Sequence, residues 1–196
     1  MADSAARVLE PMTVEQFLAF CDGQTSHERW ELIDGVPVMM TGGTAGHSIL
    51  IGNVFRALDA ASRQRGCRAM TSYLARVSNE NAFDPDVLVQ CGPIDRDSRH
   101  TGDPVVVVEV LSRSTLRRDR VLKFERYRTL EALQQIVFVY QDSVRIESWL
   151  RQQGDWMNEP TLLLRSEDRL AVPILGSSIA LTELYEGLTP SPFNDL

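Results

Sequence analysis

Two carboxylates lie in or beside runs of apolar, strand-forming residues. Glu109 stands inside the sequence Val-Val-Val-Val-Glu-Val-Leu, where strand alternation would place it on the same face as Val107 and Leu111. An isolated carboxylate buried there costs several kcal/mol unless it is paired, protonated or bound to a metal ion. Asp86 follows a proline and precedes a second apolar run, so the two acids can meet on neighbouring strands. The sequence therefore predicts a site for a hard cation, Mg²⁺ or Mn²⁺, at Asp86 and Glu109.

Each acid also has a simpler explanation. Aspartate next to proline is common where a turn leads into a strand, so Asp86 alone is weak support for a metal site. Glu109 could be a charge on an edge strand, but the valines around it favour a strand that is covered on both faces.

Lys123 lies in the most basic part of an acidic chain. At about 100° per residue, it shares one helical stripe with Asp119 and Tyr127, and this stripe should pack inward. An inward lysine needs an anion, either Glu109 on the preceding strand or a bound phosphate. Alternatively, its aliphatic part packs while the amino group reaches the rim. Basic residues of this segment are Arg113, Arg117, Arg118, Arg120, Lys123, Arg126 and Arg128.

The elements that must position these residues follow from hydrophobic periodicity and turn signals. A first helix is expected from Thr13 to Cys21, a hairpin at Asp34-Gly35, and a long helix over 45–65 that Gly66 ends. The later pattern predicts extended segments at 67–77, 86–90 and 105–111, a basic helix to about 129, strands at 135–140 and 144–150, and a short helix near 182–185. The predicted fold class is α/β (α+β), a mixed central β-sheet flanked by helices, with an N-terminal helix and β-hairpin.

Length and composition favour one domain. The chain has 196 residues, 43% of them hydrophobic, and we expect a flexible tail at 1–11, a single domain at 12–188 and a C-terminal tail at 189–196. No apolar run approaches the roughly 20 residues that span a bilayer, so a cytoplasmic location without membrane contact is expected. The net charge of −7 disfavours binding to nucleic acid through overall charge, which leaves the basic segment as the candidate contact.

The cysteines predict neither a disulfide framework nor a zinc site. Cys21, Cys67 and Cys91 are odd in number, and no pair has Cys-x-x-Cys spacing. We therefore expect buried free thiols.

Taken in order, these residues resemble the Uma family of "putative restriction endonucleases", a branch of the PD-(D/E)xK nuclease superfamily. The resemblance covers about Met12 to Gly187, and the ordered combination is more specific than any single motif. The residues that carry it are Glu-Arg-Trp-Glu-Leu-Ile-Asp-Gly at 28–35, His47 after a glycine-rich turn, Pro85-Asp86, Val-Glu-Val-Leu-Ser-x-Ser-Thr at 108–115, Asp119, Lys123 and Tyr127-Arg128.

The resemblance implies a restriction-endonuclease-like core in which Asp86 and Glu109 bind the metal and a lysine completes the catalytic site. The superfamily pattern places that lysine two residues after the second acid, where this chain has Leu111. In the Uma family the lysine is expected on the following helix, and Lys123 matches that position. Glu31 matches the acid of the N-terminal hairpin and is expected to bind metal or water; the alternative is an ordinary carboxylate that faces solvent.

Further residues are expected to contact the substrate. His47 is a candidate through the family match, although a lone histidine on an apolar helix face is more often a hydrogen-bonded core residue. Ser112 could bind a phosphate or cap the basic helix, and Asp119 could orient Lys123. Arg117, Arg118 and Arg120 are expected to steer the nucleic-acid backbone.

The function implied is hydrolysis of DNA phosphodiester bonds by a Mg²⁺- or Mn²⁺-dependent endonuclease, working as a homodimer as related nucleases often do. Two alternatives stay open. One is an inactive nuclease-like protein that binds nucleic acid or has a regulatory role. The other is a metal-dependent phosphoesterase that acts on small nucleotides, for which the net charge of −7 is no handicap.

Overall fold

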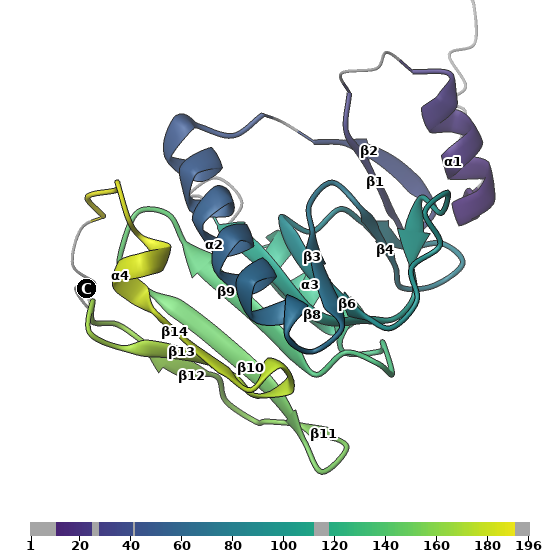
Figure 1. Ribbon diagram of the computed structural model, residues 1–196. Helices are drawn as coiled ribbons and strands as arrows, with labels where there is room; N and C mark the ends of the chain where they lie inside the picture. Colours follow the sequence, from purple (N-terminus) through teal and green to yellow (C-terminus); the bar gives the residue numbers. More distant parts are fainter. Residues whose placement is uncertain (1–10, 25–27, 41, 112–117, 191–196) are drawn as a thin grey trace, which may run out of the picture.

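A mixed seven-stranded β-sheet with helices on both faces forms the centre of the molecule (Figure 1). The computed structural model describes residues 11–24, 28–40, 42–111 and 118–190, and of residues 118 and 119 it describes the backbone alone. The tails predicted at 1–11 and 189–196 therefore lie almost entirely outside the described residues. The predicted α/β fold class is confirmed.

The large sheet has the strand order β11-β10-β9-β8-β6-β3, and β12 also pairs with β10. Strands β8 and β9 run parallel, whereas the other neighbouring pairs are antiparallel. Its strands are β3 (Cys67–Met70), β6 (Val87–Cys91), β8 (Pro104–Leu111), β9 (Gln135–Tyr140), β10 (Ile146–Gln152), β11 (Asp155–Trp156) and β12 (Thr161–Leu163).

A smaller five-stranded sheet, in the order β2-β1-β5-β4-β7, carries the N-terminal hairpin. The short link 84–86 joins β5 of this sheet to β6 of the large sheet, so residues in the link lie where the two sheets meet. Its strands are β1 (Trp30–Ile33), β2 (Val36–Met39), β4 (Leu74–Arg76), β5 (Ala82–Phe83) and β7 (His100–Thr101).

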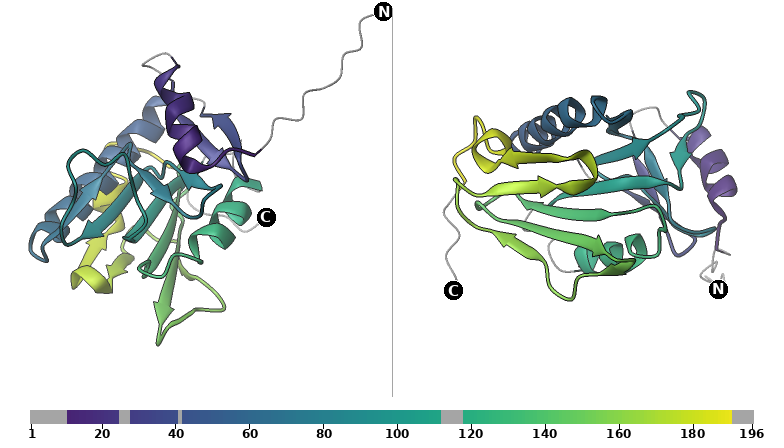
Figure 2. Two further views of the ribbon diagram at one scale, coloured as in Figure 1. Left: turned by 90° about the vertical axis from the view of Figure 1, so that its right-hand side faces the viewer. Right: turned by 60° about the horizontal axis from the view of Figure 1, so that its bottom comes forward.

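Helices cover the large sheet from both sides. Helix α2 (Ala45–Arg63) lies over one face and α3 (Arg118–Tyr127) over the other, while α1 (Val14–Asp22) packs beside the small sheet at the end of the molecule opposite α4 (Leu181–Leu184) (Figures 1 and 2). The hairpin β13 (Arg169–Val172) and β14 (Ser177–Ala180), joined by the 3-10 helix η1 (Pro173–Leu175), extends the layer of α2. No helix in the described part of the chain is long and apolar enough to cross a membrane.

Strand β8 divides its side chains between the two layers. Val106, Val108 and Val110 belong to the core cluster beneath α2. Val107 and Leu111 belong to the opposite cluster, which contains residues of α3. Glu109 therefore projects toward α3, because alternate residues of a strand share a face.

Several local signals of the sequence are confirmed. The hydroxyl oxygen of Thr13 accepts a hydrogen bond from the backbone N–H of Gln16, and the side-chain oxygen of Gln16 accepts one from the backbone N–H of Thr13, which is the predicted capping box. Asp34 and Gly35 adopt φ values of 47° and 76°, as a tight hairpin turn requires. The segment 67–77, predicted as one extended stretch, instead divides into β3 and β4 in different sheets, because the chain turns at Ser72, where φ is 54°.

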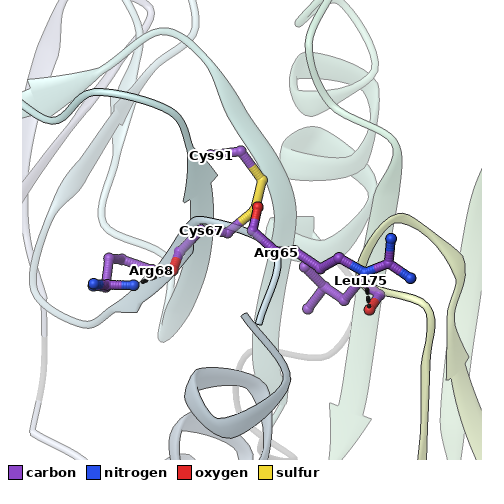
Figure 3. Close-up of a disulfide and its surroundings, with 5 residues drawn as sticks. All are labelled: Arg65, Cys67, Arg68, Cys91 and Leu175. Carbon is purple, nitrogen blue, oxygen red and sulfur yellow. Dashed lines mark hydrogen bonds between the residues drawn. A yellow bond between two sulfur atoms is a disulfide. The ribbon is translucent and has the colours of Figure 1, made fainter. Parts of the chain in front are cut away.

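The prediction of free thiols is wrong for two of the three cysteines. Cys67 and Cys91 form a disulfide bond between β3 and β6 (Figure 3). Cys21 is free. The two residues are opposite each other in the antiparallel register, a relation that depends on strand pairing and leaves no mark in cysteine spacing.

Loss of this disulfide is expected to lower the free energy of unfolding by about 3 kcal/mol. The two cysteines are 24 positions apart in sequence, and their bond restricts the unfolded chain by closing the loop between them. Urea unfolding measures this loss in two ways: in the double variant Cys67→Ala/Cys91→Ala, and in the wild type with and without a reductant. Cys21→Ala is the matched control. Equal stability of the wild type with and without reductant would contradict the prediction.

Candidate active site

The ammonium group of Lys123 lies between two buried carboxylates. Its Nζ donates hydrogen bonds to Oε1 of Glu31, at 2.8 Å, and to Oε1 of Glu109, at 3.2 Å. All three side chains are buried and come from α3, β1 and β8 respectively. Lys123 is also the only lysine in the chain, whose other basic residues are arginines. The helical stripe thus predicted the direction of Lys123 correctly.

Asp86, the residue before β6, also joins this cluster. Its Oδ2 accepts the backbone N–H of Val110 at 2.7 Å, which ties Asp86 to the strand that carries Glu109. Its Oδ1 lies 3.5 Å from Nε2 of His47, in the first turn of α2. The hydrogen bond with Asp86 raises the pKa of His47, against the effect of its partial burial.

Three residues that sequence reasoning had not assigned complete the surroundings. The hydroxyl of Tyr127 donates to Oε1 of Glu109 at 2.7 Å. Asp84 is buried, its backbone N–H donates to Oε1 of Glu31, and its Oδ2 accepts two hydrogen bonds from Arg29. The tripeptide Asp-Pro-Asp at 84–86 is the signal that could have pointed to Asp84, and the place of Tyr127 on the stripe of Lys123 could have pointed to Tyr127.

The cluster carries more negative than positive charge. Glu31, Asp84, Asp86 and Glu109, if ionised, face two fixed cations, Lys123 and Arg29, which leaves a formal charge of −2 with His47 neutral. Burial raises the pKa of Glu109 to about 7, against the attraction of Lys123.

The neighbouring charges act on Lys123 in the opposite sense. Burial by itself would lower the pKa of Lys123, but the carboxylates of Glu109 and Glu31 outweigh it and raise that pKa. Lys123 is therefore protonated at neutral pH, whereas Glu109 is in part neutral because its burial and the neighbouring carboxylates of Asp86 and Glu31 outweigh the attraction of Lys123.

The acids fit a divalent ion by charge and by donor type. Glu31 and Glu109 each keep one oxygen, Oε2, that accepts no hydrogen bond from the described residues. Among the residues that the structure describes, no group of three or more His, Cys, Asp or Glu side chains is arranged to hold a metal ion. Mg²⁺ commonly uses only one or two protein carboxylates and keeps several waters, so Asp86 and Glu109 suffice as protein ligands, and a charge of +2 matches the deficit.

The metal-free protein is expected to lose stability as the pH rises from 5 to 8. A carboxyl whose folded pKa is raised binds its proton more tightly in the folded state. Its contribution is therefore full below the unfolded pKa of about 4.5 and is lost as the pH passes the folded value of about 7. Asp84 and His47 also have raised pKa values and act in the same direction. Urea unfolding in EDTA should show a loss of about 2 to 3 kcal/mol over this range.

The control for this effect is Glu109→Gln, which should remove most of the slope. Carboxyl groups with lowered pKa values, such as Glu15 and Asp168, change protonation below this window. Burial lowers the pKa of His100, so this group acts in the opposite direction within the window and reduces the slope. A protein that is equally stable at both pH values would contradict the prediction.

Two ion pairs link α3, the helix that carries Lys123, to residues of both sheets. Arg120 donates through Nε to Oε2 of Glu147 on β10 at 2.9 Å, and Arg126 pairs with Asp34 of the hairpin turn at 2.6 Å. Glu147 is almost fully buried and also accepts hydrogen bonds from Tyr140 and Arg145. Arg120, which we predicted to contact substrate, is thus held by Glu147, and its role toward nucleic acid stays a prediction.

Other predicted contacts cannot be placed relative to this cluster. Ser112 and Arg117 lie outside the described residues, and so does the predicted helix cap at 114–115. Arg118 and Asp119 are described only as backbone of α3. Glu31, His47, Asp86, Glu109 and Lys123 are the predicted site residues that the fold brings together.

The fold matches that of a known structure. A crystal structure described as a putative nuclease belonging to DUF820, from Anabaena variabilis, superposes with a TM-score of 0.72 and covers 89% of this chain and 97% of its own, at 16% sequence identity. A mixed sheet with helices on both faces, shared at this level, places the protein in the class of restriction-endonuclease-like folds.

Sequence comparison then gives the family. Residues 14–182 match the family described as "Uma2: Putative restriction endonuclease", and the chain belongs to this family, as its motifs predicted. The uncharacterized protein slr1290 of Synechocystis sp. is 32% identical over 194 residues, which cover 96% of this chain and 98% of that protein. The uncharacterized protein sll1609 of the same organism is 30% identical over 133 residues, 65% of this chain and 75% of its own length.

Proposed function

We propose that this protein is a Mg²⁺- or Mn²⁺-dependent endonuclease that hydrolyses phosphodiester bonds of DNA. The observation that supports this most directly is the convergence of Glu31, Asp86, Glu109 and the only lysine of the chain at one buried cluster. Family membership adds the nuclease class. The protein is proposed to act in the cytoplasm as a homodimer.

Asp86 and Glu109 are the proposed metal ligands. A bound divalent ion supplies Lewis acidity and a nucleophile at neutral pH. Asp86 is oriented by the N–H of Val110, and Tyr127 fixes one oxygen of Glu109 while the other stays available. The two carboxylates are thus held by backbone and side-chain hydrogen bonds before any ion binds, which lowers the cost of ordering them.

Lys123 is proposed to stabilise negative charge on the phosphoryl group as the water attacks. A positive group fixed in advance in a buried site is worth far more there than in water. Glu31 accepts from Lys123 and so positions the ammonium group. His47, beside Asp86 at the start of α2, is proposed to contact the phosphate from the side opposite Lys123. Ser112, Arg117 and Arg118 are proposed to contact the DNA backbone.

The test is incubation of the purified protein with supercoiled plasmid and with labelled oligonucleotides in Mg²⁺, Mn²⁺, Ca²⁺ or EDTA. Cleavage in Mg²⁺ or Mn²⁺ that Asp86→Asn abolishes would support the proposal, and the exposed Asp97→Asn is the matched control. DNA left intact under all conditions would overturn it. Turnover of a small phosphodiester alone would instead favour the phosphoesterase.

A further inference from the structure

A pocket of about 310 Å³ adjoins the candidate active site at Asp86. It lies between the N-terminal half of α2, the turn after β3 and the residue before β1. This volume is at the lower end of the range of about 300 to 1,000 Å³ that small-molecule pockets occupy. Residues that line it include Arg29, Ser48, Gly52, Phe55, Ser72 and Asp86.

Gly52 keeps this pocket open. It lies in the middle of α2, where glycine costs about 0.5 to 1 kcal/mol relative to alanine because of its backbone freedom. A Cβ atom added at Gly52 would meet no atom within 4 Å, so packing does not require a glycine there. What the missing side chain leaves is space in the wall of the pocket.

The lining has the chemistry of a nucleotide site. Phe55 offers a partly buried ring for stacking, and Arg29 offers a guanidinium that is about half exposed, with 45% of its side-chain surface accessible. The hydroxyls of Ser48 and Ser72 can donate to or accept from a base edge or a sugar. Arg29 is already held by Asp84, so its plane is fixed before a ligand arrives.

Asp86 belongs both to this pocket and to the proposed metal site. A nucleotide in the pocket can therefore be continuous with a phosphodiester at Asp86 and Glu109. A base within a duplex is stacked and paired, and it cannot enter a concave pocket without leaving the stack. Unstacking costs least for a base that is already unpaired.

We propose that this pocket binds one unpaired nucleotide of a DNA strand, next to the phosphodiester that is cleaved. The protein then prefers single-stranded DNA, or duplexes with an unpaired nucleotide at the cut, over regular duplexes. This inference rests on the proposed nuclease function for its assignment of the neighbouring phosphate. Binding of the nucleotide itself can be measured without cleavage.

The experiment compares Gly52→Leu, which fills the pocket, with Ala60→Leu, which adds similar bulk at an exposed position of the same helix. Fluorescence anisotropy in Ca²⁺ measures the affinity for a labelled single-stranded 12-mer and for the same sequence as a duplex. The wild type and Ala60→Leu should bind the single strand about tenfold more tightly, which is within the range for stacking of one base. Gly52→Leu should lose this preference and keep its affinity for the duplex.

A second variant guards against misfolding. Leucine is a better helix former than glycine, so Gly52→Leu should melt no lower than the wild type. If it does melt lower, Ser48→Leu obstructs the same pocket from an exposed position and should give the same loss of single-strand preference. The fluorescence of a 2-aminopurine base placed in the 12-mer reports on its stacking. It should change on binding to the wild type and to Ala60→Leu, and should not change on binding to Gly52→Leu or Ser48→Leu.

The outcomes separate the pocket from the nuclease. Equal affinity of the wild type and both pocket variants for the single strand overturns the inference, even if the protein cuts DNA, and so does an absence of DNA binding. A single-strand preference that depends on Gly52 without cleavage in Mg²⁺ or Mn²⁺ supports the pocket and contradicts the proposed catalytic function.

Discussion

Glu109→Gln is expected to lower the rate of DNA cleavage in Mg²⁺ by about 10³-fold or more. Glutamine has the shape of glutamate and can still accept from Tyr127 and Lys123, but it lacks the charge that a divalent ion requires. The loss of several kcal/mol of charge stabilisation in the transition state corresponds to a factor of this size. Plasmid-nicking rates measure it.

Calorimetric titration with Mn²⁺ measures metal binding by the same variant independently of cleavage. The wild type should show a binding event that Glu109→Gln weakens or removes, while the variant keeps a cooperative thermal transition. Glu125→Gln, an exposed position on α3, is the matched control. Cleavage at the wild-type rate in Glu109→Gln would remove this residue from the active site.

Lys123→Met is expected to reduce cleavage by about 10² to 10³-fold, the usual effect of removing one preorganised donor for developing charge. Its effect on stability should depend on metal. Without Lys123, Glu31 and Glu109 are buried acids without a counterion, and breaking such a pair costs about 3 to 5 kcal/mol. A divalent cation can replace the lost charge, so Mn²⁺ should raise the melting temperature of the variant more than that of the wild type.

The single lysine allows a direct check of its protonation. Lysine labelled with ¹³C at Cε gives one side-chain signal in this chain, and that signal should remain in the charged form at a pH where exposed lysines titrate. Lys123→Arg is the matched variant, because it keeps the charge and changes the geometry. If Lys123→Met cleaved DNA as fast as the wild type, Lys123 would contribute to the stability of the fold and not to catalysis.

Local pattern was sufficient for much of the fold. The valine run predicted β8 and the face of Glu109, and the helical stripe predicted that Lys123 points inward, because strand and helix periods depend only on neighbouring residues. Capping and turn residues, such as Thr13 and Gly35, similarly have preferences set by local backbone geometry.

Contacts between distant segments could not be predicted in this way. The bond between Cys67 and Cys91 depends on the register of β3 and β6, and the pair of Arg29 and Asp84 joins residues 55 positions apart. The hairpin of β13 and β14 was missed because its strands are short and are joined through Pro173. The pocket beside Asp86 likewise depends on the docking of α2, which no local pattern contains.

The position of the lysine on α3 changes what controls the geometry of the cluster. Where an acid and a lysine occupy alternate positions of one strand, covalent geometry fixes their separation. Here Leu111 fills that position in the core, and the separation of Glu109 and Lys123 depends on how α3 is docked. Apolar residues of α3, Leu122, Phe124 and Tyr127, hold this docking, and the pair of Arg120 with Glu147 adds to it. Substitutions at remote positions such as Glu147 are therefore expected to change the separation of Glu109 and Lys123 without changing either residue, which gives natural variation and protein engineering a means of altering the cluster from a distance.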